Sequence, residues 1–118
     1  WTPQEYDGAL TRIFAQDYQK LSPYIDVFTP LIYVKKSGRT ARWGRDFLEQ
    51  AQTFIPSANK VALILDELDF PNSLVETAKS AIPTWGLQMF AGEHVFADDE
   101  KARLYKNAIQ TIKFALQG

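Results

Sequence analysis

Two kinds of apolar segment alternate along the chain, and the first kind is typical of β-strands. The segment KVALILDELDF, residues 60–70, is apolar in its first part and acidic in its last. Residues 25–34 and 85–92 are also apolar and rich in β-branched or aromatic side chains, as in strands covered on both faces. Pro30 cannot donate to a sheet ladder, so it predicts an edge, a bulge or an irregular start, with the regular part at 31–34.

The second kind of segment, with apolar residues three or four positions apart, predicts helices, and the first helix opens the chain. Thr2 is placed as N-cap, Pro3 as the first helical residue, and Glu5 closes a capping box. The pattern continues until Pro23, so we expect one helix between these points. Its expected apolar stripe consists of Tyr6, Leu10, Ile13, Phe14, Tyr18 and Leu21.

Three more helices are predicted, one after each strand. The first has Thr40 as its N-cap, the second spans 73–81 from the capping box Ser73-Leu74-Val75-Glu76, and the third starts at Asp98 or Asp99. The apolar face expected of the first comprises Trp43, Phe47, Ala51, Phe54 and Ile55, and that of the last Ala102, Tyr105, Ala108, Ile109, Ile112 and Leu116.

Strands that alternate with helices, without a tight hairpin signal between them, predict a parallel sheet of three strands. We therefore expect a single α/β domain over residues 1–118, with the loops that follow the strands on one edge. The expected strand starts, Asp26, Lys60 and Trp85, lie 34 and 25 residues apart. This spacing fits either part of a (β/α)8 barrel or a flavodoxin-like open sheet.

Composition excludes several other classes of protein. The 118 residues are 46% hydrophobic, which is typical of globular domains, and 13 basic against 14 acidic residues give no footprint for nucleic acid. The absence of cysteine excludes disulfides and thiolate metal sites. No apolar run approaches the roughly 20 residues that a membrane helix needs, so we expect a soluble chain without a membrane partner.

The amino-acid sequences of the predicted strands also resemble those of a known family. The segments YIDVFTPLIYVKKSGR, KVALILDELDF and WGLQMFAGEHVF resemble strands six, seven and eight of glycoside-hydrolase-type barrels. The resemblance spans nearly the whole chain and is closest to a group of largely uncharacterised bacterial barrel proteins classed as glycosidases. Because a full barrel needs about 250 residues, the resemblance implies that this chain is the carboxyl-terminal part of a larger barrel. The exposed inner face of such a part predicts self-association unless the missing amino-terminal half covers it.

Polar side chains follow each predicted strand and should gather at one edge of the sheet. They are Lys35, Lys36 and Arg39 after the first strand, Asp66, Glu67 and Asp69 after the second, and Glu93 and His94 after the third. Asp66 and Glu67 point to opposite sides of an extended strand, so only one of them can face a barrel axis.

The resemblance also implies roles for these residues. Such enzymes carry a carboxylate nucleophile at the end of strand seven, which makes Glu67 or Asp66 the candidate nucleophile or stabiliser, with Glu93 a further catalytic candidate. Their acid on strand four is not within these residues, so we expect the isolated chain to be inactive. The candidate substrate-binding residues are Tyr33, Lys35, Arg39, Asp69 and His94.

A simpler interpretation treats the acids as a solvated loop in which Asp69 or Asn72 caps the next helix. His94 is then a surface residue, and without a second histidine at ligand spacing we expect no metal and no other cofactor. Trp43 and Trp85 are expected in the core rather than as platforms for a sugar.

Two functions are therefore expected. One is the carboxyl-terminal part of a barrel glycoside hydrolase whose partner is an oligosaccharide. The other is a non-catalytic α/β module that binds a ligand or a protein partner at the same edge. The sequence specifies neither the substrate nor the compartment, and an extracellular or periplasmic location stays open.

Overall fold

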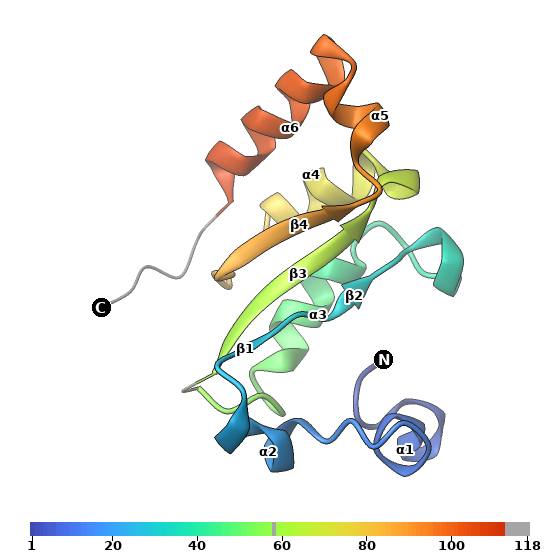
Figure 1. Cartoon of the computed structure of the whole chain (residues 1–118), viewed down its shortest axis with the longest axis vertical. Helices are drawn as coiled ribbons and strands as arrows, with labels where there is room; N and C mark the ends of the chain where they lie inside the picture. Colours follow the sequence, from blue (N-terminus) through green and yellow to red (C-terminus); the bar gives the residue numbers. More distant parts are fainter. Residues whose placement is uncertain (58, 113–118) are drawn as a thin grey trace.

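The strands and helices alternate as the apolar pattern predicts (Figure 1). A computed structural model describes residues 1–57 and 59–112. The strands are β1 Val27–Phe28, β2 Leu31–Ile32, β3 Lys60–Asp66 and β4 Gly86–Phe90. The α-helices are α1 Glu5–Arg12, α2 Tyr18–Leu21, α3 Trp43–Ala51, α4 Asn72–Ala78, α5 Glu93–Phe96 and α6 Asp99–Thr111. The short 3-10 helices are η1 Ser22–Tyr24, η2 Lys35–Ser37 and η3 Glu67–Asp69. Within these ranges no helix has the length and apolarity that crossing a bilayer requires.

β1 and β2 act as one strand that is interrupted at Pro30. Val27 pairs with Lys60 and Leu31 with Ile64, and both pairings are parallel to β3. The offset is 33 positions in each case (60 − 27 and 64 − 31), so the register continues across the gap. Proline lacks the amide hydrogen, yet its carbonyl still accepts the N–H of Ile64 at 3.1 Å. The predicted regular part at 31–34 is therefore shorter than expected, since pairing ends at Ile32.

β4 occupies the other edge of β3. Five parallel pairs join them, from Ala62 with Gly86 to Asp66 with Phe90. β3 is thus the central strand, because β1, β2 and β4 all pair with it, with β1 and β2 on one edge and β4 on the other. The prediction of a parallel sheet is confirmed, but the sheet has four strands instead of the expected three, because the first expected strand is divided at Pro30. The carboxyl ends of β2, β3 and β4 share one edge (Figure 1).

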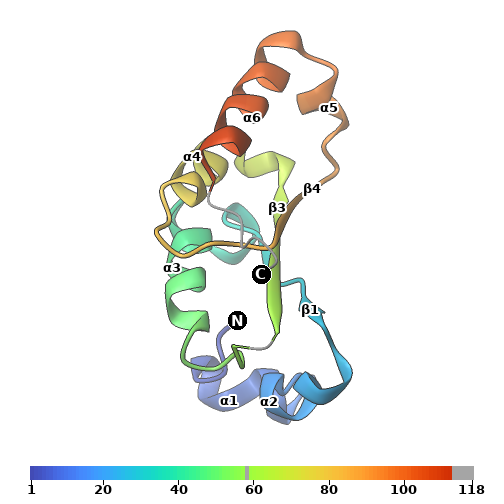
Figure 2. The same ribbon diagram turned by 90° about the vertical axis from the view of Figure 1, so that its left-hand side faces the viewer.

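One face of the sheet is covered by helices. Figure 2 shows α3, α4 and α6 on the same side of β3. Leu63 and Leu65 of β3 are fully buried on this side, against a core that includes Phe47 and Leu74. The helices pack closely, because a Cβ added at Gly44 of α3 would lie 2.5 Å from the hydroxyl oxygen of Thr77 of α4. The apolar face predicted for the first of these helices is buried as expected: Trp43, Phe47, Ala51, Phe54 and Ile55.

The opposite face of the sheet has no helix over β3 and β4 in the part of the chain that the structure describes (Figure 2). We call it the open face, and its residues alternate with the core residues: Leu31, Tyr33, Ala62, Ile64, Asp66, Gln88 and Phe90. Leu31, Ile64 and Gln88 are in register across the strands, as are Asp66 and Phe90, whereas Tyr33 follows the last pair of β2. Ala62 and Asp66 are buried. Leu31 is 56% and Phe90 51% exposed. Parallel sheets are ordinarily covered on both faces, so this face lacks its usual cover.

The amino-terminal segment differs from the single helix that we expect. Only half of the expected capping box forms: the Thr2 N–H donates to Glu5 Oε1 at 2.8 Å, but α1 has Gln4 rather than Thr2 as its N-cap, and no side chain caps it. However, Gly8 has φ 73° and its two preceding residues are also left-handed, so a regular helix cannot run through them. A new helix, α2, begins where Asp17 accepts the N–H of Lys20. Ile13, at 66% exposure, consequently lies outside the core.

The last two predicted helices form where they are expected, but their caps and ends differ in part from the prediction. The capping box expected at Ser73 does not form, since the Ser73 hydroxyl is buried without a partner and Glu76 pairs with Lys79 at 2.6 Å. α4 accordingly starts at Asn72 and ends at Ala78, short of 81. Asp98 caps α6 by accepting the N–H of Lys101, as predicted. Ala108 and Ile112 are buried, Ala102, Tyr105 and Ile109 half-buried, and Leu116 lies outside the described residues.

Candidate functional site

The predicted polar residues gather at the carboxyl edge of the sheet, but in two separate groups. The first group, which we call the Asp66 cluster, contains Tyr33, Lys36, Asp66 and Phe90. The second, the Glu67 cluster, contains Glu67, Glu93 and His94. The end of β3 explains the division, because Asp66 is the last residue of the strand, whereas Glu67 is the first residue of the 3-10 helix η3.

Asp66 is a buried carboxylate at the end of the open face. It is the last residue of β3, is in register with Phe90, and is 2% exposed. Its Oδ2 lies 2.9 Å from Lys36 Nζ, and its Oδ1 accepts the N–H of Leu68 at 3.1 Å. A carboxylate buried to this degree needs a counter-charge, and Lys36 supplies it from the neighbouring loop.

Two aromatic rings stand beside this ion pair. The rings of Tyr33 and Phe90 lie 5.8 Å apart between centroids, one following β2 and one ending β4. Lys36 Nζ is 5.0 Å from the first centroid and 5.3 Å from the second, within the range of cation–π attraction. The hydrogen bond to Asp66 is the main cause that raises the pKa of Lys36. Lys36 is therefore an ammonium at neutral pH, between a carboxylate and two aromatic faces.

Asp69 holds the loop that carries Lys36. Its Oδ2 accepts the N–H of Val34 at 2.8 Å and its Oδ1 accepts the N–H of Lys35 at 3.0 Å. The expectation that Asp69 caps the following helix is wrong, since both of its oxygens bind the loop after β2. Because both are engaged, the geometry of Asp69 suits a positioning residue better than a direct ligand of a substrate.

Lys35 and Arg39, which the sequence predicts as substrate-binding residues, do not reach Asp66. Arg39 forms an ion pair with Glu5 at 2.6 Å and stacks at 3.7 Å over the ring of Trp43. The side chain of Lys35 is exposed, while its amide is held by Asp69. The KKSGR loop therefore contributes only Lys36 to the cluster.

The Glu67 cluster joins two segments of chain. Glu67 starts η3, and Glu93 and His94 start α5. One ligating atom from each lies within 4.8 Å of the others. Glu67 lines a pocket of about 310 Å³ beside α6, together with Val95 and Lys101, and its Oε1 is buried without a hydrogen-bond partner. Glu93 and His94 are exposed.

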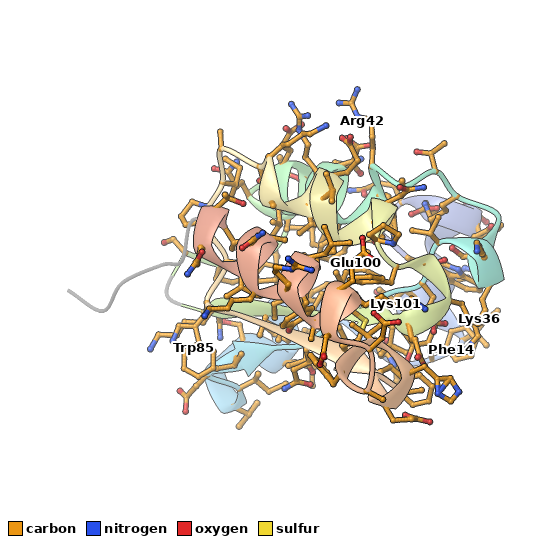
Figure 3. All side chains as sticks on the ribbon, turned by 90° about the horizontal axis from the view of Figure 1, so that it is seen from above. Phe14, Lys36, Arg42, Trp85, Glu100 and Lys101 are labelled. Carbon is orange, nitrogen blue, oxygen red and sulfur yellow. The ribbon has the colours of Figure 1, made fainter. Side chains whose placement is uncertain are left out.

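Some features of the site are missed or misplaced by sequence reasoning. Phe90 is not among the predicted site residues, although its pairing with Asp66 places both residues on the same face. Lys36 is expected at this edge, but not among the substrate-binding residues. Trp85 is expected in the core, but it is 41% exposed, with Lys60 Nζ 5.4 Å from its ring. Trp85 precedes β4 and lies on the opposite side of the molecule from Lys36 in Figure 3, so it cannot share the site.

Comparisons with protein-family models, with curated proteins and with solved structures found no match for this chain. The geometry of the two clusters is therefore the basis for assigning a function. The Asp66 cluster offers one carboxylate, one ammonium and two aromatic faces at the end of an uncovered sheet, and the Glu67 cluster offers two carboxylates and an imidazole.

Proposed function

We propose that this chain is the carboxyl-terminal portion of a (β/α)8-barrel glycoside hydrolase, with Asp66 as its glycan-facing carboxylate. The observation that carries the proposal is the position of Asp66 on the open face, at the carboxyl end of β3, beside the rings of Tyr33 and Phe90. Active sites of parallel barrels lie at this end of the strands.

The topology supports a barrel. The three strand positions lie side by side in chain order, and α3 and α4 cover the same face (Figure 2). In a doubly wound sheet helices cover both faces, whereas in a barrel the second face is the interior. The exposed Leu31 and Phe90 on the open face are what a barrel interior would enclose. Further strands would pair with the two edges of the sheet, and they would also close the open face into a barrel interior.

The geometry favours Asp66 over Glu67 as the carboxylate that acts on the glycan. Flat apolar rings pack against the C–H faces of sugars, and such rings flank Asp66, whereas Glu67 lies in the group with Glu93 and His94. Glycosidases need two carboxyl groups, about 5 Å apart for retention and farther for inversion. We assign the second group to a strand outside these 118 residues, so the chain alone should bind glycans without cleaving them.

A second candidate function is a non-catalytic binding module at the same edge. It is favoured by one observation: both oxygens of Asp66 are already engaged, Oδ1 by a hydrogen bond from the Leu68 amide and Oδ2 by the ion pair with Lys36. A carboxylate held in this way can bind a hydroxyl-rich ligand without attacking it. Both candidate functions use the Asp66 cluster, and they differ in whether the bound glycan is hydrolysed.

Oligosaccharide titration of the 118-residue chain tests the shared part of these proposals. We expect chemical-shift changes at Tyr33 and Phe90 on adding a panel of neutral and acidic oligosaccharides, and at least about tenfold weaker binding in Phe90→Ala. Trp85→Ala is the matched control, because Trp85 is an exposed aromatic residue at the other end of the sheet. Equal affinity in both variants, or no binding across the panel, would contradict the proposal.

A further inference from the structure

Three side chains of metal-ligating type meet at the Glu67 cluster, from segments about 26 positions apart in the sequence (93 − 67). Glu67, Glu93 and His94 each place one ligating atom within 4.8 Å of the other two. From this arrangement we propose that the Glu67 cluster binds a divalent transition-metal ion such as Zn²⁺.

The buried oxygen of Glu67 points to a ligand independently of this proximity. Its Oε1 is inaccessible to solvent, and no donor in the described residues hydrogen-bonds to it. A buried carboxylate oxygen without a donor is costly, because the lost hydration is not replaced. A cation bound through this oxygen would remove this cost, and the other two members of the cluster, a carboxylate and an imidazole, can complete its coordination.

The chemistry of the donors selects the class of metal. Two carboxylate oxygens and one imidazole nitrogen suit Zn²⁺ and similar transition ions, whereas Ca²⁺ and Mg²⁺ prefer oxygen alone. Three protein ligands also leave a coordination position for water. Ligating atoms around a tetrahedral zinc ion lie roughly 3–3.5 Å apart, given bonds of about 2.0–2.2 Å. Rotations of the exposed Glu93 and His94 side chains can close the present separation to this value.

This inference does not rest on the proposed glycan site. The Asp66 cluster shares no residue with the Glu67 cluster. The competing arrangement is a metal-free one in which the imidazole of His94 only contacts the two carboxylates. The two arrangements differ in whether Zn²⁺ changes the environment of the imidazole.

His94 is the one histidine of the chain, which makes the test sharp. The untagged 118-residue chain, freed of metal, is titrated with Zn²⁺ by calorimetry and by nitrogen-15 NMR of the imidazole. We expect one equivalent to bind and the imidazole signal to shift at the same ratio. His94→Ala and Glu67→Gln should each weaken binding at least about tenfold. Glu49→Gln, an exposed carboxylate on α3, should bind as the wild type does.

A calcium titration completes the test, since loss of the imidazole should affect Zn²⁺ binding and leave any weak Ca²⁺ binding unchanged. Circular dichroism checks that the variants are folded, which the exposure of His94 favours. An imidazole signal that does not move in excess Zn²⁺, or Zn²⁺ affinity that is equal in His94→Ala and wild type, would overturn the proposal.

Discussion

Lys36 and Asp66 form an ion pair in which one partner is half exposed and the other is buried. The Nζ and Oδ2 atoms are 2.9 Å apart, and the side-chain exposures are 48% and 3%. The cation reaches the carboxylate from the loop after β2, so the pair also links two neighbouring strand ends. Because Asp66 is enclosed by the protein, the buried carboxylate depends on the cation more than the cation depends on it.

Replacing Lys36 by methionine should therefore destabilise the fold, because a buried carboxylate loses its counter-charge. The midpoint of urea unfolding should fall in Lys36→Met and stay close to wild type in Lys35→Met, whose side chain is exposed and pairs with no carboxylate among the described residues. Adding Asp66→Asn to Lys36→Met should recover part of the loss. Equal midpoints in the two single variants would contradict this interpretation of the pair.

Asp69 should be important for stability through the backbone rather than through charge. Asp69→Ala removes the acceptor of two amides, those of Val34 and Lys35, and leaves at least the buried one unsatisfied. We expect a loss of about 1–3 kcal/mol in the free energy of unfolding. Hydrogen exchange of these two amides should accelerate more than that of the β3 amides. Unchanged exchange at Val34 would show that the bond does not form.

The amino-terminal segment should depend on pH through Glu5. Burial acts to raise the pKa of Glu5, but hydrogen bonds from the Thr2 amide and from Arg39 outweigh it and hold the pKa below its usual 4.5. A lowered pKa in the folded state stabilises the protein above pH 4.5, and this stabilisation is lost as the pH falls through the folded-state value. Unfolding measured between pH 7 and 3 should show a shallower pH dependence in Arg39→Gln. Identical slopes would contradict the assignment.

The open face should drive association of the isolated chain, as its sequence also predicts. Leu31 and Phe90 are exposed there, and exposed apolar side chains of this size favour contact between copies. Sedimentation should show association that increases with concentration and that Leu31→Lys weakens. Val75→Lys, at an exposed apolar position on the helical face, is the control. A monomer at all concentrations would remove this prediction.

The sheet is predictable because its signals are local and strong. The continuous apolar run of β3 and the absence of hairpin turns are enough to predict parallel strands. The helix boundaries are less accurate because capping patterns compete with tertiary contacts. The pattern at Thr2 forms its hydrogen bond and still does not start a regular helix, and the pattern at Ser73 does not form at all.

The location of the site can be predicted from the sequence, but the side chains that contact one another within it cannot. Parallel strands place all three loops on one edge, so Asp66, Glu67 and Glu93 are expected near one another. Which loop residue reaches Asp66 depends on how Asp69 fixes the loop after β2, a contact between positions 35 apart. Spacing cannot show such a contact, and this is why sequence reasoning favours Arg39 over Lys36.

The most direct test of the proposed function is glycan hydrolysis by the native polypeptide that carries this chain. Turnover of an oligosaccharide panel is measured for wild type, Asp66→Asn and the exposed control Glu49→Gln, with folding checked by circular dichroism. We predict hydrolysis by the wild type and the control, and a kcat at least about 10²-fold lower in folded Asp66→Asn. Full turnover by Asp66→Asn, or no hydrolysis of any glycan by the folded wild type, would contradict the proposal.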